Sequence, residues 1–262
     1  MIAYTFISGA TGGIGKALSK ECVKKGYNLF LTGRSQEKLE RLKLELLKIN
    51  NVEIDYFACD IASPDDRSKM LEYIDKKGYL FDRIINVAGV DIQKPFLEYT
   101  REKILFQTRV NVEATIDLTY ALLNKRALGL EVLTISSMSG VSPMPNFALY
   151  SATKSLLTNL FTALHYELKK DKIKVTVVLP GGVYTREDII EDIKGQGIWG
   201  KLSAKTPEFV ARKSLKALSK NKVKYIPGFF NKLLNFLMKI APKKLVLNFI
   251  EKRWRNNRKD AF

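Results

Sequence analysis

The stretch Ser8-Gly9-Ala10-Thr11-Gly12-Gly13-Ile14-Gly15 decides the fold class of this 262-residue chain. It ends an apolar run at residues 2–8 and leads into a helical pattern at 13–25. Its glycine spacing, G-x-x-x-G-x-G, allows a tight turn and lets the backbone approach a pyrophosphate at the start of a helix, where free N–H groups favour an anion. An ordinary glycine-rich turn is the competing interpretation, but the position at the first strand–helix junction favours a dinucleotide-binding loop.

The rest of the chain alternates short apolar runs with amphipathic helical patterns. The β-rich runs lie at 2–8, 27–32, 52–58, 82–87, 131–136, 173–179 and 223–226, and the helical patterns at 13–25, 36–49, 64–77, 100–126, 148–170 and 206–220. Ser63-Pro64 and Thr206-Pro207 predict two helix starts, each with a capping hydroxyl and a first-position proline. The alternation predicts a parallel sheet with helices on both faces. We therefore expect an α/β fold with one doubly wound Rossmann-type domain at 1–226, a mainly parallel seven-stranded sheet, and a helical C-terminal extension at 227–262.

The composition limits the class of protein further. The hydrophobic content of 46% is sufficient for a sizeable core, and no apolar run approaches the ~18–20 residues that a membrane-spanning helix needs. A strand-like segment follows Met1 directly, which leaves no room for a signal peptide and favours a cytoplasmic location. Cys22 and Cys59 belong to no C-x-x-C pattern, so we expect reduced thiols. The single histidine, His165, is expected to be structural, and we expect neither a histidine-based triad nor a metal site.

The end of the second predicted strand indicates which cofactor the loop would bind. An acidic residue about 20 positions after the glycines is typical of NAD-binding folds. Here the sequence reads Leu31-Thr32-Gly33-Arg34-Ser35, with no acid before Glu37. The planar fork of Arg34 suits a 2′-phosphate, Ser35 can add a hydroxyl, and Lys16 can add positive charge. A solvated surface arginine is the alternative, and we expect NADP(H) in preference to NAD(H).

A second constellation lies at Tyr150-Ser151-Ala152-Thr153-Lys154, with Ser137 thirteen residues upstream. A tyrosine and a lysine four residues apart share one helix face. The ammonium group can then lower the pKa of the phenol, as acid–base work near neutral pH requires. By itself this spacing is a weak signal in a chain rich in lysine and tyrosine.

Taken together, these motifs resemble the short-chain dehydrogenase/reductase family from Ile2 to about Tyr225. Ser8–Gly15 is similar to the family's T-G-x-x-x-G-x-G loop, and Asn86-Val87-Ala88-Gly89 to its N-N-A-G segment with Val87 as a departure. Pro180-Gly181-Gly182-Val183-Tyr184-Thr185 matches P-G-x-V-x-T. The resemblance implies cofactor contacts from Gly9, Thr11, Gly13, Ile14, Gly15, Arg34, Ser35, Asp60, Ile61, Asn86, Ala88, Gly89, Tyr150, Lys154, Pro180, Gly181, Val183 and Thr185.

The resemblance also implies an NADPH-dependent reduction of a carbonyl, or the reverse oxidation of an alcohol. Tyr150 would exchange a proton with the substrate oxygen, and Ser137 would hydrogen-bond the same oxygen. Lys154 would lower the pKa of the tyrosine and contact the nicotinamide ribose. Asn111 would hold a water that links Lys154 to solvent. Val87 replaces a polar side chain, which can alter local rigidity without removing a reacting group.

The substrate is indicated only by apolar segments. The family's substrate loop corresponds to residues between Val183 and Lys205, and Ser142–Phe147 would form another wall of the pocket. These residues predict a lipophilic ketone or acyl substrate, although they could instead cap the core. A 3-oxoacyl-[acyl-carrier-protein] reductase whose carrier docks on Lys125 and Arg126 is the alternative, and a nonenzymatic NADPH-binding scaffold or sensor is a weaker one. The apolar loop residues are Ile189, Ile190, Ile193, Ile198 and Trp199.

The C-terminal segment is strongly basic. Residues 222–262 hold 11 Lys/Arg and 2 Asp/Glu, which is +9 of the chain's net charge of +17. Helical patterns run from Phe229 to Ala241 and onward from Pro242, both rich in phenylalanine and leucine. Such helices can lie on an anionic membrane face, cover the substrate pocket, or pack in a subunit interface. The resemblance implies a homo-oligomer, a dimer or tetramer, paired through the helices near 100–126 and 148–170. No nucleic-acid motif accompanies the charge, so no nucleic-acid partner is expected.

Overall fold

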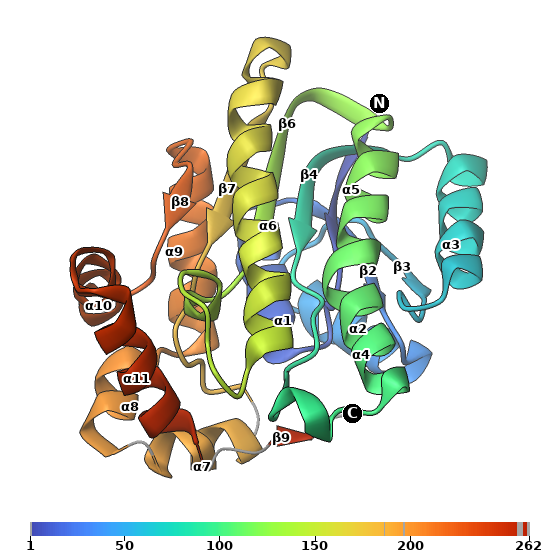
Figure 1. Ribbon diagram of the computed structural model, residues 1–262. Coiled ribbons are helices and arrows are strands. Elements are labelled where there is room, and N and C mark those ends of the chain that lie inside the picture. The colour runs from blue at the N-terminus through green and yellow to red at the C-terminus, as the bar shows by residue number, and fades with distance from the viewer. Residues whose placement is uncertain (1, 186, 196, 256–258, 261–262) are drawn as a thin grey trace.

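The computed structural model describes residues 2–185, 187–195, 197–255 and 259–260, with the side chains at 188, 192, 194, 195 and 197–199 and from 256 onward left undescribed. Within these residues seven parallel strands form one sheet in the order β3-β2-β1-β4-β6-β7-β8 (Figure 1). The expected doubly wound, seven-stranded Rossmann-type architecture is confirmed. The strands of the sheet are β1 (Ala3–Ile7), β2 (Asn28–Gly33), β3 (Ile54–Ala58), β4 (Leu80–Asn86), β6 (Arg126–Ile135), β7 (Lys174–Val178) and β8 (Lys224–Tyr225).

Helices cover both faces of this sheet. Ser63 and Thr206 cap α3 and α9 as predicted, since their hydroxyls accept hydrogen bonds from the N–H groups of Asp66 and Phe209, both at 3.2 Å. The α-helices are α1 (Gly13–Lys24), α2 (Gln36–Leu47), α3 (Pro64–Lys77), α4 (Arg101–Thr108), α5 (Ala114–Leu123), α6 (Ala148–Glu167), α7 (Glu187–Gly195), α8 (Gly197–Ser203), α9 (Pro207–Ser219), α10 (Phe229–Ile240) and α11 (Lys243–Trp254).

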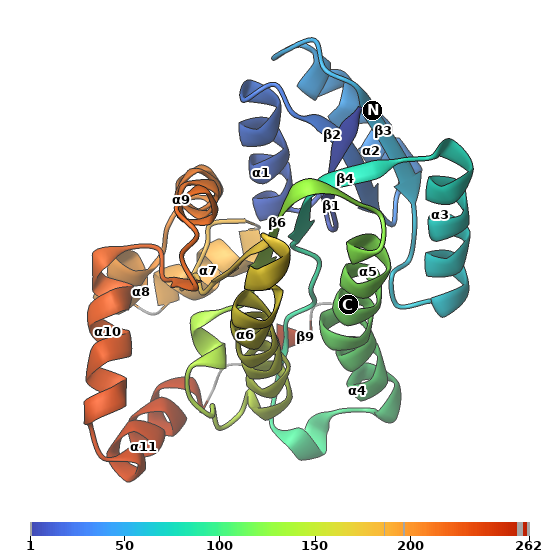
Figure 2. The ribbon, with the colours of Figure 1, turned by 90° about the horizontal axis from the view of Figure 1, so that it is seen from above.

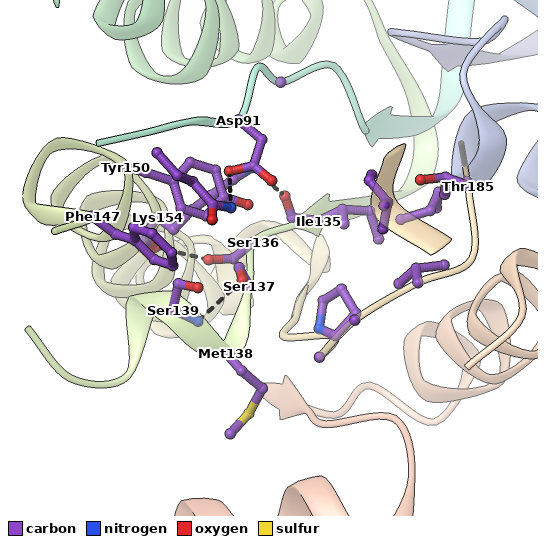
Figure 3. A pocket seen from close by; sticks show the side chains of 18 of the residues that line it. Asp91, Ile135, Ser136, Ser137, Met138, Ser139, Phe147, Tyr150, Lys154 and Thr185 are labelled. Atoms are coloured by element: carbon purple, nitrogen blue, oxygen red, sulfur yellow. Dashed lines mark hydrogen bonds between the residues drawn. The ribbon is translucent and has the colours of Figure 1, made fainter. Parts of the chain in front are cut away.

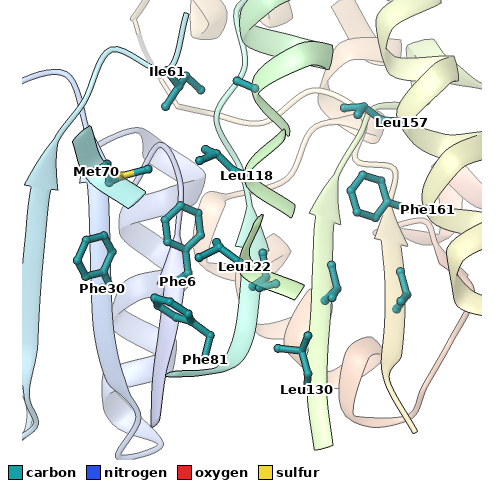
Figure 4. Packing of buried hydrophobic residues seen from close by; sticks show 14 of the residues in the cluster. Phe6, Phe30, Ile61, Met70, Phe81, Leu118, Leu122, Leu130, Leu157 and Phe161 are labelled. Carbon is teal, nitrogen blue, oxygen red and sulfur yellow. The ribbon is translucent and has the colours of Figure 1, made fainter. Parts of the chain in front are cut away.

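Alternate residues of the central strands enter two separate cores, because successive side chains of a strand point to opposite faces. Phe6 and Ile84 pack with the helices α3, α5 and α6, as Figure 4 shows for Phe6, Leu118 and Phe161. Their neighbours Ile7 and Ile85 pack on the other face with α1, α2 and α9. Figure 2 shows these two helical layers from above. The continuous apolar strands of the sequence are therefore buried on both sides.

The structure differs from the predicted elements in three places. The helix expected at 100–126 is interrupted by a π-helical turn at Arg109–Glu113, and Arg126 already begins β6. The segment expected to be a substrate loop forms the two helices α7 and α8. A two-stranded antiparallel sheet joins β5 (Ile92–Gln93) to β9 (Lys259–Asp260).

The C-terminal extension lies beyond the β8 edge of the sheet, where α10 stands next to α8 and α11 follows α10 (Figures 1 and 2). The buried Asn231 fixes its start, because its Nδ2 atom donates to the carbonyl oxygens of Ser203 at 2.8 Å and Pro227 at 2.9 Å. None of the helices in the described part of the chain has the length and apolar character needed to cross a bilayer.

Candidate active site

A cavity of ≈ 1060 Å³ opens at the carboxyl ends of β1, β4, β6 and β7. This edge of a parallel sheet, at the point where the strand order reverses, is where doubly wound folds bind ligands. The cavity is lined by the glycine loop, by Tyr150 and Lys154, and by apolar residues of α10 and α11. Sites for a cofactor and for a substrate are therefore continuous.

The glycine loop leaves no room for a side chain at Gly9, Gly13 or Gly15. Gly9 has a φ of +63°, and a Cβ added there would lie 2.8 Å from the Cα atom of Ala88. A Cβ at Gly13 would lie 2.7 Å from Cγ2 of Thr185, so the loop and the Pro180–Thr185 segment meet at this point. The backbone N–H groups at the start of α1 thus face the cavity directly, as a pyrophosphate requires. The predicted loop residues Gly9, Thr11, Gly13, Ile14 and Gly15 all line the cavity.

Most of the other predicted cofactor residues also lie on the cavity wall, and two do not. The hydroxyl of Ser35 accepts a hydrogen bond from Lys38 N–H as the cap of α2. The amide of Asn86 is buried and donates to the hydroxyls of Thr119 at 2.9 Å and Thr134 at 3.2 Å. Both side chains therefore stabilise local structure and do not line the cavity. The predicted residues on the wall outside the loop are Arg34, Asp60, Ile61, Ala88, Gly89, Tyr150, Lys154, Pro180, Gly181, Val183 and Thr185.

Lys16, the cation expected to add positive charge beside Arg34, does not line the cavity. The ammonium group of Lys16 forms an ion pair with Glu45 at 2.7 Å instead. Lys38, one turn along α2 from Arg34, lines the cavity together with Arg34. The sequence could have indicated Lys38, because it lies in the first turn of the helix that follows Arg34, and this turn faces the same edge of the sheet.

The predicted catalytic side chains Ser137, Tyr150 and Lys154 lie together on the cavity wall (Figure 3). The Nζ atom of Lys154 lies 5.9 Å from the centre of the Tyr150 ring and donates to the carbonyl oxygen of Ile135 at 3.3 Å. Ser137 Oγ accepts a hydrogen bond from Ser139 N–H at 3.0 Å, which fixes its orientation. The helical spacing of Tyr150 and Lys154 is thus realised at the start of α6.

The pKa values of this pair are set mainly by burial. Burial raises the pKa of Tyr150 far above its ordinary value; the charge of Asp91 adds to the increase, and the hydrogen bond with Ser137 opposes it. Burial lowers the pKa of Lys154 to about 8, and the Asp91 charge acts in the opposite direction. We expected Lys154 to lower the pKa of Tyr150. The groups that the protein itself supplies raise this pKa instead, so that expectation is wrong for the protein alone. Near pH 7 these groups hold Tyr150 in its protonated, proton-donating form.

Asp91 is a site residue that the sequence reasoning missed. Figure 3 shows its carboxylate beside Tyr150 and Lys154, and Gln93 Nε2 donates to its Oδ1 atom. The backbone on either side is held in place, since Asn111 Oδ1 accepts from Val90 N–H at 2.7 Å and Gln107 Oε1 from Ile92 N–H at 3.1 Å. Its position two residues after the N-V-A-G segment was the available signal.

Asn111 lies in the π-helical turn and is fully buried. Its Nδ2 atom donates to the Val90 carbonyl oxygen at 3.0 Å and to Thr153 Oγ1 at 3.1 Å. The amide therefore joins α6 to the segment that carries Asp91. An ideal Cβ on Gly89 would lie 3.2 Å from Lys154 Nζ and 3.3 Å from Asn111 Oδ1, so both groups approach this glycine. The water relay through Asn111 stays a prediction.

Apolar side chains form the far wall of the cavity. Ile189 and Ile193 of α7 line it, while the side chains of Ile198 and Trp199 lie outside the described residues. The ring of Phe147 packs against Trp254 of α11, with centroids 5.1 Å apart. Of the roles considered for the C-terminal extension, lining the pocket is thus observed. The residues contributed by α10 and α11 are Phe230, Asn231, Leu234, Leu237, Met238, Leu245, Val246, Phe249, Ile250, Arg253 and Trp254.

Two further predictions concern residues outside the cavity. His165 is structural, as expected, because its Nδ1 atom contacts the Val175 carbonyl oxygen at 2.7 Å on the buried side of α6. Lys125, considered as part of a docking site for an acidic carrier protein, forms an ion pair with Asp75. Arg126 donates to the carbonyl oxygen of Leu123 at 2.8 Å. Both cations of that patch therefore already have partners within the chain.

The fold, the glycine loop and the Ser137–Tyr150–Lys154 group define a dinucleotide-binding α/β protein of the oxidoreductase class. The sequence model of the short chain dehydrogenase family matches residues 3–190. The chain therefore belongs to the short-chain dehydrogenase family.

Two curated relatives are named very-long-chain 3-oxoacyl-CoA reductase. The protein from Neurospora crassa is 34% identical over 184 residues, which cover 67% of this chain and 54% of that protein. The Bos taurus protein is 29% identical over 222 residues, 82% of this chain and 68% of that protein. The chain thus spans about half the length of the fungal relative.

Solved structures show the same fold. A 7β-hydroxysteroid dehydrogenase superposes with a TM-score of 0.82 at 24% identity, covering 95% of this chain and 96% of that one. The L-sorbose reductase of Gluconobacter frateurii, solved with NADPH and L-sorbose, superposes with a TM-score of 0.78 at 23% identity, covering 87% of this chain and 95% of that one.

Proposed function

We propose that this protein is an NADPH-dependent reductase of a lipophilic carbonyl substrate, with a 3-oxoacyl thioester as the favoured class. One observation carries the proposal: a single cavity connects the glycine loop, the Tyr150 hydroxyl and an apolar wall built from α7, α10 and α11. The curated relatives named very-long-chain 3-oxoacyl-CoA reductase support the acyl class. The cytoplasm, where thiols such as the free Cys22 and Cys59 stay reduced, is the proposed compartment.

The side chains on the cavity wall suit this reaction. The bound nicotinamide cofactor would supply the hydride. Tyr150 would give its proton to the carbonyl oxygen, and its raised pKa keeps that proton available at neutral pH. Ser137, oriented by Ser139 N–H, would hydrogen-bond the same oxygen. Lys154 would contribute positive charge beside the phenol as negative charge develops on the oxygen.

Arg34 and Lys38 support NADPH over NADH. Both line the cavity at the end of β2, where the 2′-position of an adenine ribose would lie if the pyrophosphate sits on the glycine loop. A 2′-phosphate carries charge that these two cations can neutralise, and charge-assisted hydrogen bonds to it are about twice as strong as neutral ones.

A comparison of cofactors tests this assignment. Arg34→Ala is expected to lower kcat/KM for NADPH by about 10–100-fold and to change kcat/KM for NADH by less than about threefold. Arg41→Ala, which removes an exposed arginine of α2, the helix that follows Arg34, is the control and should leave both values unchanged. Equal losses with both cofactors after Arg34→Ala would argue against a 2′-phosphate site.

The substrate class is tested by NADPH oxidation with 3-oxoacyl-CoA thioesters of increasing chain length, with steroid ketones and with small ketones. The apolar wall predicts that KM falls as the acyl chain lengthens, because each buried methylene contributes about 0.8 kcal/mol. A preference for short polar ketones would contradict the proposed substrate.

A further inference from the structure

Helix α10 has two apolar faces, and only one of them is used by the cavity. Phe230, Leu234 and Met238 line the cavity. Phe229, Leu233, Phe236 and Ile240, called here the outer stripe, do not line it and are exposed, with exposed fractions of 82%, 43%, 58% and 64%. Their spacing of four, three and four residues places them along one side of the helix. An apolar stripe of this size on a surface calls for a partner.

The charge around the outer stripe indicates the chemistry of that partner. Residues 227–255 hold seven Lys/Arg and one acidic residue, Glu251. Glu251 is already paired with Arg255 at 2.8 Å. Lys232 and Lys239 are exposed and lie on one flank of the stripe, since each precedes a stripe residue by one position. An apolar stripe beside lysines complements a surface that is both apolar and anionic.

We propose that α10 and α11 dock on the surface of a lipid bilayer that contains anionic lipid. The outer stripe would enter the boundary between headgroups and acyl chains, and the lysines would contact the headgroups. These helices are twelve residues each, so they lie on the bilayer and do not cross it. A protein partner fits less well, because it would have to supply a long apolar groove bordered by acids.

Docking would bring the cavity entrance to the membrane. Leu237, Leu245 and Phe249 line the cavity and are also about half exposed, so they stand at its rim. Leu237 directly follows Phe236, which belongs to the outer stripe. A lipid substrate could therefore pass from the bilayer to Tyr150 along apolar side chains. This consequence rests on the proposed reductase activity, whereas docking itself does not.

Flotation of the full chain with vesicles tests the proposal. The protein should float with phosphatidylcholine vesicles that contain phosphatidylglycerol at low salt, and float less at high salt or with pure phosphatidylcholine. Phe236→Ser combined with Ile240→Ser should lower the partition coefficient at least about tenfold, as should Lys232→Gln combined with Lys239→Gln. Leu97→Ser combined with Leu128→Ser removes two leucines elsewhere that are even more exposed than Phe236 and Ile240, and should change it less than about twofold.

Three results would overturn the proposal. They are the absence of flotation with anionic vesicles, flotation of the stripe variant at the wild-type level, and a change of oligomeric state in the stripe variant with vesicle binding intact. The last result would assign the stripe to a second copy of the chain. Thermal unfolding and NADPH binding confirm that each variant is folded. Reduction of a water-soluble 3-oxoacyl substrate is measured separately, so loss of docking and failure of the proposed reaction are distinguishable.

Discussion

The Tyr150 hydroxyl is the group on which the proposed chemistry depends, and its surroundings favour proton donation. Burial and the nearby Asp91 charge both raise its pKa. Lys154 is buried as well, which lowers its pKa to about 8, while Asp91 counteracts this decrease. Removing the Asp91 charge would therefore lower the pKa of both groups. The carboxylate therefore favours the protonated form of Tyr150, which is the form that the proposed carbonyl reduction would need.

Asp91→Asn tests this effect. The alkaline limb of the pH profile of kcat/KM for reduction should move to lower pH, because Lys154 and Tyr150 would both lose their protons more readily. The measurement is NADPH oxidation between pH 6 and 10. Asp171→Asn removes a carboxylate far from the cavity, on the exposed 3-10 turn after α6, and is the control. A limb that stays in place, or moves to higher pH, would rule out this role for Asp91.

At the scale of single residues, local motifs predicted the site well. The glycine loop and the side chains of Ser137, Tyr150 and Lys154 all line the cavity. The loop is a single turn and Tyr150 and Lys154 share one helix, so spacing fixes their geometry, whereas Ser137 follows β6 and meets them through the fold. Ser35 and Asn86 were predicted on the cavity, yet nearby backbone and hydroxyl groups use their hydrogen bonds. Asp91 was missed because the motif assignment ended at Gly89, and the proximity of Asp91 to α6 arises from the tertiary fold.

At the scale of elements, the π-helical turn at Arg109–Glu113 joins the two halves of a helix that periodicity predicted as continuous. Such turns occur often at functional sites, and this one carries Asn111. Arg67 of α3, almost fully buried, holds the turn in place. It donates to Glu113 at 2.6 Å, to Asp117 at 2.5 Å and to the Ile61 carbonyl oxygen at 2.6 Å.

Arg67→Met should reduce the free energy of unfolding by about 2–3 kcal/mol, because it leaves the Ile61 carbonyl oxygen without its partner and breaks two ion pairs. The two carboxylates are half exposed, so water solvates them and limits the loss. Urea unfolding measures the change. Lys125→Met removes a more exposed ion pair with Asp75 and should cost less than about 1 kcal/mol. Equal losses in the two variants would contradict the structural role given to Arg67.

Periodicity predicted every strand of the main sheet and most of the helices, because each must bury one apolar face or stripe. It did not predict α7 and α8, because the resemblance assigned this segment to the family's substrate loop. It also could not predict the pairing of β5 with β9, two short strands far apart in the chain. The π-helical turn lies inside a continuous helical pattern, and β5 and β9 correspond to none of the β-rich runs of the sequence.

At the scale of the whole molecule, exposed apolar side chains on α5 and α6 support the predicted homo-oligomer. Helices α5 and α6 cover the same face of the sheet (Figure 2). Tyr120 of α5 and Leu156 and Tyr166 of α6 are exposed. Light scattering should give two or four times the mass of the chain. Tyr120→Glu combined with Leu156→Glu should produce monomers, since each places a charge in the proposed interface.

Leu128→Glu, at an exposed position of β6, is the control for that experiment and should leave the mass unchanged. A wild-type protein that is monomeric at micromolar concentration would refute the pairing through α5 and α6. This interface is separate from the outer stripe of α10, so the oligomer and the membrane contact can be tested independently.

The central claim is that one cavity holds NADPH and a lipophilic carbonyl on either side of Tyr150. The most direct test is single-turnover oxidation of NADPH by a long-chain 3-oxoacyl-CoA in the wild type and in Tyr150→Phe, with NADPH affinity measured by fluorescence. We expect the variant to react about 10²–10⁴-fold more slowly while it binds NADPH with unchanged affinity. An equal rate in both proteins would contradict the role of Tyr150 and with it the proposed reaction.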